Sequence, residues 1–565
     1  MPVRRTLLGV ATAVLTILAG SAPAVAADTP YDVLVFSKTA GFRHDSIGTG
    51  VQAIRDLGAA NGFTVTATED AGAFTSANLA QYETVVFLNT TGDVLNATQQ
   101  SAFESYIRGG GGYTGVHAAA DTEYDWPFYG QLVGAWFASH PAIQPARVHV
   151  EDRAHPATAH LPQVWNRTDE WYDYRTNARD TAHVLATLDE SSYSGGTMGA
   201  DHPHAWCKTF DAGRSFYTGG GHTRESYADP VFRQHLLGGI RYTAGQVQAD
   251  CRPETGYTPL YNGSTTGWSQ AGPGGFTDSD ATLTSVGGMG MLWYSAKAFT
   301  DYSLKLDWKM AGDDNSGVFI GFPPSSDPWS AVNNGYEIQI DATDAADRTT
   351  GAVYSFQGAD VAARDAALNP PGEWNTYELL VQGERLQILL NGIKINDFTN
   401  TDPVRGLAGH IGLQNHGNGD DVSFRNIRIK ELGTPPPPTA GRVVGLAGKC
   451  LDVSGAGTAD GTKIQLWTCN GTGAQNWQLS GQVWRNPASG KCLDVAGGAT
   501  ANGTKVQLWT CNGTGAQNWT VATDRTVRNP QSGRCLDVSE ARPSDGQQIH
   551  LWDCLAAPNQ LWTVN

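Results

Sequence analysis

The chain has 565 residues, of which 40% are hydrophobic and 10% aromatic, and this composition is typical of folded globular domains. Because a single hydrophobic core stops growing near ~250–300 residues, the length predicts several domains. The formal net charge of −17 argues against binding to nucleic acid or to an anionic membrane surface, since both need clustered Lys and Arg.

Residues 1–27 are typical of an export signal. A basic start precedes an apolar run at 7–18 and a small-residue end, a pattern that predicts cleavage after Ala26 or Ala27. Two adjacent arginines near the start fit a twin-arginine signal, and an ordinary Sec signal fits equally. No later stretch approaches the ~20 apolar residues that span a bilayer. We therefore expect a secreted, extracellular protein with no membrane anchor.

Residues 28–250 are predicted to form an α/β domain. The runs YDVLVFS at 31–37 and YETVVFLNT at 82–90 are typical of buried strands, and a third strand ends at the turn 115–117. Helical patterns alternate with these strands. The alternation favours a parallel, doubly wound sheet with its site at the carboxyl ends of the strands.

Three histidines follow strands of this domain. His44, His117 and His222 are each expected at the site edge of the sheet. They could bind a divalent metal, act as general acid and base, or hydrogen-bond loop backbone. No motif indicates a nucleotide or a redox cofactor. His117 and His222 are candidate catalytic residues.

The domain resembles the trehalose-utilisation (ThuA-like) family in four segments: SKTAGFRHDS (37–46), DEWYDY (169–174), DHPHAW (201–206) and GRSFYTGGGHTRESY (213–227). The resemblance implies the flavodoxin-like α/β fold of class I glutamine amidotransferases. Those enzymes carry a cysteine on a sharp strand-to-helix turn and a His–Glu pair on a later turn. Here His117 stands at the place of the cysteine, and His222 and Glu225 stand at the place of the pair. Without a thiolate, acyl-enzyme chemistry is not implied.

Residues 255–432 are predicted to form a two-sheet β-sandwich, because short strand-like runs alternate with Gly and Asn turns. In the run GYEIQIDA, side-chain alternation places Glu337, Gln339 and Asp341 on one strand face. Three such polar groups favour a functional site, against the alternative of a solvated outer face.

A second run of this domain, HIGLQNH, places His410, Gln414 and His416 on one face. We expect His416 to face Glu337 from a neighbouring strand. Tyr354 is a further candidate for a nearby acid or donor.

Together the strand patterns resemble the 3-keto-disaccharide hydrolase domain family, which implies a concanavalin-like jelly roll and cleavage of 3-keto-glycosides. A ketone at C3 acidifies the C2 proton, so the glycosidic oxygen can leave by elimination with the help of a base and an acid. Glu337, Gln339, Asp341 and His416 are the candidate catalytic residues. The GYEIQIDA strand is also similar to the catalytic strand of family 16 glycanases, and an ordinary endo-glycanase is the alternative.

The last part of the chain repeats itself. A Pro-rich linker, GTPPPPTAG at 433–441, precedes three copies of a unit near 42 residues within 440–565, and copies of this size must close around a shared core. Each copy holds two cysteines 19 residues apart, which predicts local disulfides. The predicted pairs are Cys450–Cys469, Cys492–Cys511, Cys535–Cys554 and, from the remaining two cysteines, Cys207–Cys251.

The CLDV, QLW and closing Q-x-W motifs of these copies resemble the ricin B-type lectin domain, a β-trefoil that is also the family 13 carbohydrate-binding module. The resemblance implies one sugar pocket in each copy, built from an Asp, a polar residue, an aromatic residue and closing amides. Trp477, Trp519 and Trp562 are expected in the core instead. The implied pocket residues are Asp452, Gln465, Trp467 and Gln475; Asp494, Gln507, Trp509 and Gln517; and Asp537, His550, Trp552, Asn559 and Gln560.

A carbohydrate-binding module next to two candidate sites indicates a secreted carbohydrate-active protein whose partner is a polysaccharide or an oligosaccharide. We expect a glycosidase-type enzyme that acts on 3-keto-glycosides. The alternatives are an ordinary endo-glycanase and a non-catalytic protein that only binds carbohydrate.

Overall fold

The computed structural model describes residues 28–432, 441–480, 482–522 and 525–564. The expected export signal and nearly all of the Pro-rich linker lie outside these residues. The chain falls into two compact units, one that ends at Leu432 and one that follows it. Among the described residues, the helices are all too short or too polar to cross a membrane.

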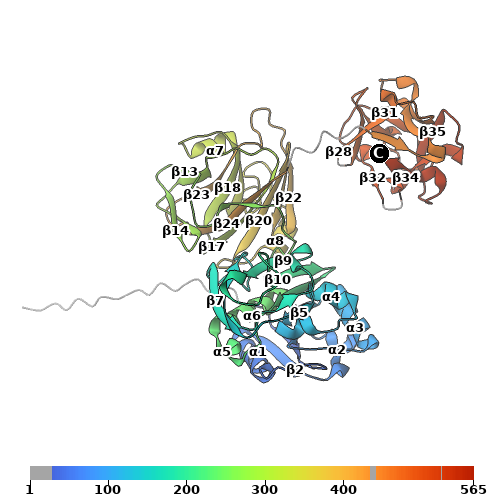
Figure 1. Ribbon diagram of the computed structural model, residues 1–565. Coiled ribbons are helices and arrows are strands. Elements are labelled where there is room, and N and C mark those ends of the chain that lie inside the picture. Colours follow the sequence, from blue (N-terminus) through green and yellow to red (C-terminus); the bar gives the residue numbers. More distant parts are fainter. Residues whose placement is uncertain (1–27, 433–440, 481, 523–524, 565) are drawn as a thin grey trace, which may run out of the picture. The chain divides into compact units, whose positions relative to one another are not determined.

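The first domain is built on one mixed sheet (Figure 1). Its strands are β1 (Tyr31–Phe36), β2 (Phe63–Thr68), β3 (Thr84–Leu88), β4 (Gly112–Val116), β6 (Gln144–Val150), β7 (Val164–Asp169), β9 (His183–Leu188), β10 (Pro203–Phe210) and β11 (Gly213–Thr218). They lie in the order β2-β1-β3-β4-β11-β10-β9-β6-β7. Pairing is parallel from β2 to β11 and antiparallel from β11 to β7. The sequence predicted the parallel part alone, and the antiparallel extension corrects it.

Helices cover both faces of this sheet, as expected for a doubly wound domain. They are α1 (Ile47–Asn61), α2 (Ser76–Leu79), α3 (Ala97–Arg108), α4 (Pro127–Val133), α5 (Arg224–Ala228) and α6 (Pro230–Thr243). Alternate side chains of β1 enter two different cores. Val33 and Val35 pack with residues of α1 and α6, whereas Leu34 and Phe36 pack with residues of α3 and α4. The sheet therefore separates two apolar cores.

The second domain is a β-sandwich, as predicted. The larger sheet comprises β12 (Thr258–Tyr261), β14 (Gly275–Ser279), β15 (Thr282–Val286), β17 (Tyr302–Met310), β20 (Asn375–Gln382), β21 (Arg385–Leu390), β22 (Ile393–Thr399) and β24 (Val422–Glu431). The smaller sheet comprises, in spatial order, β13 (Trp268–Ala271), β16 (Gly290–Tyr294), β23 (His410–Asn415), β18 (Asn315–Phe322) and β19 (Tyr336–Asp341). The sheets share one apolar core, to which β19 contributes Tyr336, Ile338 and Ile340.

The outer face of the smaller sheet carries a separate apolar cluster. Helix α7 (Trp329–Asn334) packs there through Ala331 against Phe319 and Phe322 of β18. A second helix, α8 (Val361–Ala367), packs near β22. Because β19 alternates, its polar side chains point to the same outer face as α7.

The second unit is the β-trefoil (Figure 1). Its strands are β25 (Gly441–Val444), β26 (Cys450–Val453), β27 (Thr462–Trp467), β28 (Asn476–Ser480), β29 (Val483–Asn486), β30 (Lys491–Val495), β31 (Val506–Trp509), β32 (Thr520–Val521), β33 (Val527–Asn529), β34 (Arg534–Val538), β35 (Gln547–Trp552) and β36 (Thr563–Val564). The three copies share one apolar core. Trp477, Trp519 and Trp562 are buried in it, as predicted.

Disulfides close the loops that the cysteine spacing predicted. The described residues contain the pairs Cys207–Cys251, Cys450–Cys469, Cys492–Cys511 and Cys535–Cys554, and no free cysteine. In each trefoil copy the bond joins the CLDV strand to the segment just after the QLW strand. Such links stabilise mainly by restricting the unfolded chain, typically by about 2–4 kcal/mol each.

Candidate functional site

His117 lies on the sharp turn after β4, where the amidotransferase-like resemblance placed it. Its φ is +48°, a left-handed conformation that is strained for a residue with a side chain. The ring is completely buried. Its Nδ1 lies 2.8 Å from the carbonyl oxygen of Gly219. Because a carbonyl only accepts, Nδ1 carries a proton, and in the neutral ring Nε2 keeps a lone pair.

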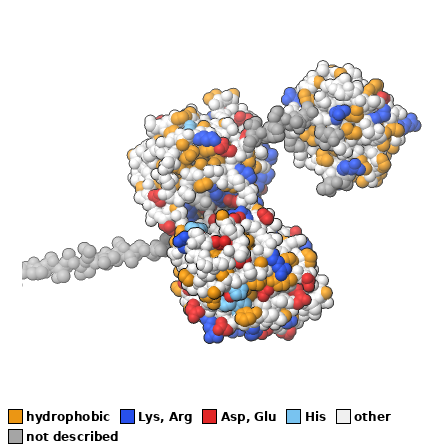
Figure 2. All heavy atoms as spheres, in the orientation of Figure 1, with side chains coloured by type: hydrophobic (Ala, Val, Ile, Leu, Met, Phe, Trp, Pro, Cys, Tyr) orange, Lys and Arg blue, Asp and Glu red, His pale blue; other side chains and the backbone are white. Residues whose placement is uncertain are grey.

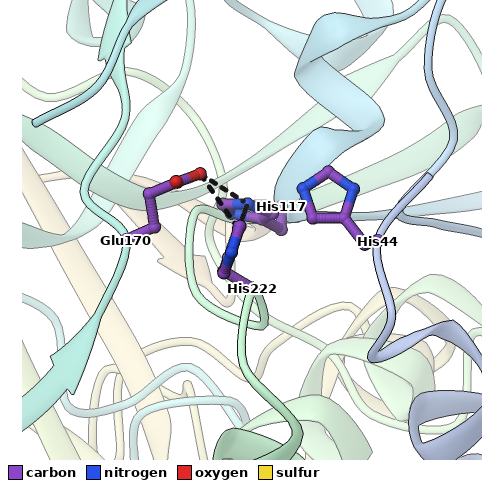
Figure 3. A group of neighbouring side chains, drawn as sticks. All are labelled: His44, His117, Glu170 and His222. Atoms are coloured by element: carbon purple, nitrogen blue, oxygen red, sulfur yellow. Dashed lines mark hydrogen bonds and ion pairs between the residues drawn. The ribbon is translucent and has the colours of Figure 1, made fainter. Parts of the chain in front are cut away.

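That lone pair faces two further side chains (Figure 3). His117 Nε2 lies 3.2 Å from His222 Nδ1 and 3.4 Å from Glu170 Oε2. His222 Nδ1 lies 3.0 Å from the same Glu170 oxygen. The three atoms thus form a nearly equilateral triangle at the carboxyl ends of β4, β7 and β11.

His44 completes the group from the loop after β1. Its ring centroid lies 5.0 Å from that of His117 and 4.9 Å from that of His222, on the side opposite Glu170 in Figure 3. Its Nδ1 is buried and finds no hydrogen-bond partner among the described residues. Burial, with smaller contributions from His117 and His222, lowers the pKa of His44 to about 3. The convergence of the three histidines that the sequence predicted is therefore present.

Outer contacts hold these side chains in place. Asp169, at the end of β7, is buried and accepts hydrogen bonds from the backbone N–H groups of Gly221 (2.8 Å) and His222 (3.1 Å). Glu170 is held on its other oxygen, because His140 Nδ1 lies 3.0 Å from Oε1. Asp169 thus fixes the loop that carries His222, and the Glu170 carboxylate presents one oxygen, Oε2, to the cluster.

The charges within the cluster depend on Glu170. Burial alone would raise the pKa of its carboxyl, but hydrogen bonds and charges from His117 and His222 outweigh burial and hold that pKa well below its usual range. Burial would lower the pKa of His222, but the hydrogen bond and charge of Glu170 outweigh it, so this pKa is raised. The Glu170 carboxylate therefore favours a positive charge on His222.

The acidic partner differs from the one that the resemblance implied. Glu225 is exposed in the first turn of α5 and does not belong to the cluster. Glu170 takes its place, from the DEWYDY segment that the sequence analysis recognised only as a motif. Helix α5 begins two residues after His222 and turns Glu225 to solvent. Glu170, the residue directly after β7, lies at the sheet edge near His117 and His222 instead.

A second candidate site lies on the outer face of the smaller sheet of the sandwich. It is a cavity of about 300 Å³, a volume suited to a small ligand. Trp329, at the start of α7, is 52% exposed and lines it. The other lining residues are Met289, Gly290, Asn315, Phe319, Pro328, Val332, Glu337, Gln339, Tyr354, Gln414 and His416.

Glu337 is the acidic group of this cavity. Its side chain lies against the backbone of Gly317 on β18, where a Cβ atom would come within 2.5 Å of Oε1. Burial, only partly offset by a hydrogen bond from Gln414, raises the pKa of Glu337 to about 8. The carboxyl is therefore protonated and neutral at pH 7. The amide oxygens of Gln339 and Gln414 are also buried and without partners among the described residues.

The structure does not bring Asp341 to this cavity. Its Oδ1 accepts hydrogen bonds from the backbone N–H groups of Thr343 (2.8 Å) and Asp344 (3.0 Å). Its Oδ2 accepts from Asn315 Nδ2 at 2.7 Å. Alternation along β19 holds, but the chain turns immediately after Asp341, and the turn engages the carboxylate. The expectation that Asp341 points into a shared groove with Glu337 is therefore corrected.

His416 lies just after β23 and lines the cavity, as the sequence indicated. Its Nδ1 lies 3.0 Å from Oδ2 of Asp420, a residue that the sequence analysis missed. A carboxylate at this nitrogen orients an imidazole for proton transfer at the other. His410, by contrast, is buried with Nδ1 2.9 Å from the carbonyl oxygen of Tyr294, which indicates a structural role.

Each trefoil copy brings together the polar side chains that the resemblance implied. In the first copy, Asp452 accepts from the Nε2 atoms of Gln465 (2.9 Å) and Gln475 (3.0 Å). In the second copy, the corresponding distances from Asp494 to Gln507 and Gln517 are the same. Burial raises the pKa values of both carboxyls.

The third pocket is the most densely bonded. Asp537 accepts from His550 Nε2, Asn559 Nδ2 and Gln560 Nε2, each at 2.8 Å. The ring of His550 stacks on Trp552, with centroids 5.4 Å apart. The first two copies have Ala474 and Ala516 where Asn559 donates.

An exposed indole stands beside each of these aspartates. Trp467, Trp509 and Trp552 are 37%, 38% and 40% exposed, whereas the core tryptophans donate Nε1–H to backbone carbonyls. An open aromatic face beside a fixed carboxylate suits a sugar ring, whose C–H side stacks while its hydroxyls donate.

Comparison with known proteins agrees with this three-domain order. Family models match residues 32–243 (ThuA, trehalose utilisation), 256–430 (3-keto-alpha-glucoside-1,2-lyase-like domain) and 439–562 (ricin-type beta-trefoil lectin domain).

Solved structures resemble the three parts separately. A protein described as ThuA-like from Bacteroides uniformis is 24% identical, with 39% of this chain and 94% of that chain covered and a TM-score of 0.34. A protein described as a glycosyl hydrolase from Parabacteroides distasonis is 25% identical, with 32% of this chain and 100% of that chain covered and a TM-score of 0.27. The C-half of the earthworm R-type lectin, solved in complex with GalNAc, is 21% identical, with 23% of this chain and 98% of that chain covered and a TM-score of 0.21. The family models and the fold together show that the chain carries, in this order, a ThuA-like α/β domain, a 3-keto-disaccharide hydrolase-like β-sandwich and a ricin B-type lectin β-trefoil.

Proposed function

We propose that the protein cleaves 3-keto-glycosides by elimination in the cavity of its β-sandwich, while the β-trefoil holds it on carbohydrate. One observation carries this proposal. Among the described residues that line the cavity, Glu337 is the single carboxyl group, and an imidazole, His416, lies in the same lining. One neutral acid and one imidazole are the pair that an elimination needs.

The bond changes are as follows. A base removes the proton from C2, next to the C3 ketone, and the electron pair forms the C1–C2 double bond. The C1–O bond breaks, and the glycosidic oxygen leaves with a proton from an acid. The products are an alcohol and a 2-hydroxy-enone sugar, and water can then add to C1 to give the free 3-keto sugar.

We assign the acid to Glu337 and the base to His416. The pKa of Glu337, raised by burial to about 8, keeps a proton available near neutral pH. His416 is oriented by Asp420. The amides of Gln339 and Gln414 would receive sugar hydroxyls, and Trp329 offers a face for the ring.

The same lining argues against an ordinary endo-glycanase. Retaining and inverting glycosidases both use two carboxyl groups that flank the scissile bond. The second acid of the strand, Asp341, is engaged by the turn after β19, so the pair required for such hydrolysis is not assembled in this cavity.

We further propose that the protein works outside the cell. Residues 1–27 have the pattern of an export signal. The disulfides between the described cysteines favour an oxidising compartment. Trefoil pockets in triplicate would raise avidity for a polysaccharide that presents the same sugar repeatedly.

The test is a side-by-side incubation of the purified chain with a 3-keto-glycoside and the corresponding unmodified glycoside. We expect cleavage of the keto form and a loss of at least about 100-fold in kcat/KM for Glu337→Gln. Asp341→Asn is the matched control and should retain activity, because Asp341 does not line the cavity. Full activity of Glu337→Gln would contradict the assignment, and no turnover of either substrate would favour a carbohydrate-binding protein.

A further inference from the structure

The cluster of His44, His117, Glu170 and His222 has no part in the proposed cleavage. Each residue offers one ligand atom, and these atoms all lie within 4.8 Å of one another. Three of the four residues are buried, and the side chain of His222 is 20% exposed. Figure 2 shows histidine side chains at the surface of the first domain.

The hydrogen bonds of the cluster do not balance by themselves. In the neutral ring of His117, Nδ1 donates to Gly219, so Nε2 is an acceptor, and Glu170 Oε2 is also an acceptor. These two atoms face each other at 3.4 Å. His222 Nδ1 carries at most one proton in the neutral ring, and it lies 3.2 and 3.0 Å from both. One proton therefore serves two acceptors.

We propose that this cluster binds a divalent transition metal of the zinc class. A tetrahedral site with bonds of about 2.0–2.1 Å has neighbouring ligand atoms about 3.3 Å apart. The separations of 3.0, 3.2 and 3.4 Å among the ligand atoms of His222, His117 and Glu170 fit three corners of this geometry. His44 offers the fourth ligand atom, within 4.8 Å of the other three. A cation at the centre would receive the lone pairs that otherwise repel one another.

The surroundings have the form of a supporting shell for a metal. Metal-binding histidines usually donate their second nitrogen to a carbonyl or a carboxylate, as His117 does to Gly219. His140 holds the other oxygen of Glu170. Asp169 holds the backbone at His222. These contacts fix the direction of the ligands.

The ligand set also selects the ion. Three imidazoles and one carboxylate suit zinc, cobalt, nickel or iron, whereas magnesium and calcium prefer oxygen ligands and water. When bound, such an ion supplies Lewis-acid chemistry to an oxygen-containing ligand.

Two other groups of potential ligands among the described residues are less suited. Cys207 and Cys251, next to His155, are joined in a disulfide. In the group of Asp173, Glu190 and His202, Glu190 Oε1 already accepts from the backbone N–H of Met198 (2.8 Å) and lies 2.8 Å from His202 Nδ1.

The experiment is a titration of the untagged, chelator-treated chain with Co²⁺, followed by visible absorption. We expect one Co²⁺ per chain, displacement by Zn²⁺, and no displacement by Mg²⁺. Glu170→Gln and His222→Gln should each weaken the affinity by at least about 100-fold, since even outer contacts of a metal site are worth 10–100-fold.

The matched controls are Glu225→Gln and His149→Gln, which alter an exposed carboxyl and an exposed imidazole of the same domain. They should bind Co²⁺ like the unchanged chain. Near-ultraviolet circular dichroism reports whether each variant folds, and His44→Gln replaces any variant that does not.

Absence of stoichiometric Co²⁺ and Zn²⁺ binding by the folded chain would overturn the proposal. So would unchanged affinity in Glu170→Gln and His222→Gln. The result is independent of the proposed cleavage, because the titration uses no 3-keto-glycoside. Glu337→Gln should bind Co²⁺ with the affinity of the unchanged chain.

Discussion

Replacement of Glu337 by Gln should remove a pH dependence from the stability of the sandwich. Burial raises the pKa of this carboxyl from 4.5 to about 8 in the folded protein. Below pH 4.5 the folded and unfolded states both hold the proton. As the pH rises from 4.5 to 8, the unfolded chain releases it and the folded chain keeps it, so the free energy of unfolding falls. Above pH 8 both states are ionised and the slope vanishes.

The size of the effect follows from the shift. The difference, 8 − 4.5 = 3.5 units, corresponds to about 5 kcal/mol at about 1.4 kcal/mol per unit. This is an upper bound, because water that enters the cavity would stabilise the ionised form. Gln is neutral and nearly isosteric with Glu. As the pH rises from 4.5 to 8, the free energy of unfolding of Glu337→Gln should therefore increase relative to that of the unchanged protein by up to this amount.

The assay is pulse proteolysis over a urea series at several pH values, with peptides from residues 256–430 as the reporter of this domain. Glu431→Gln is the control, because Glu431 is an exposed carboxyl of the same domain. Stability profiles of the unchanged chain and Glu337→Gln that run parallel from pH 4.5 to 8 would refute the reasoning.

Three further changes probe the candidate sites. Gly317→Ala places a Cβ within 2.5 Å of the Glu337 carboxyl and should lower kcat/KM on a 3-keto-glycoside at least about tenfold while the far-ultraviolet circular dichroism stays unchanged. Asp341→Asn should cost about 1–2 kcal/mol in urea unfolding, because the amide accepts the turn N–H bonds less well. Asp537→Asn with Trp552→Ala should weaken pull-down on insoluble polysaccharide about tenfold, or ~1.4 kcal/mol, without loss of turnover on a soluble substrate; equal pull-down would contradict the pocket.

Features with a short period or an exact repeat could be predicted from the sequence. The CLDV and QLW motifs and the cysteine spacing sufficed for the trefoil, because each copy closes its own disulfide and pocket. Alternation along GYEIQIDA placed Glu337 and Gln339 on one face, because side-chain direction in a strand has a period of two. The position of His117 after a buried strand placed it at the sheet edge.

Features that depend on distant parts of the chain could not be predicted. Glu170 follows β7, the edge strand that β10, β9 and β6 separate from β11. It meets His117 and His222 only through the tertiary fold, and no local sequence pattern encodes that contact. Asp341 does not share the cavity with Glu337 because its carboxylate accepts hydrogen bonds from the backbone N–H groups of Thr343 and Asp344 in the following turn. Trp329 follows no strand pattern, and it reaches the cavity only through the packing of α7.

The most direct test of the central claim is the rate of cleavage of a 3-keto-glycoside that carries deuterium at C2. Elimination breaks the C2–H bond, so the account predicts a slower kcat/KM for the deuterated substrate with the unchanged chain, and no cleavage of the glycoside that lacks the ketone. Equal rates for the two isotopic forms, together with cleavage of the unmodified glycoside, would contradict it.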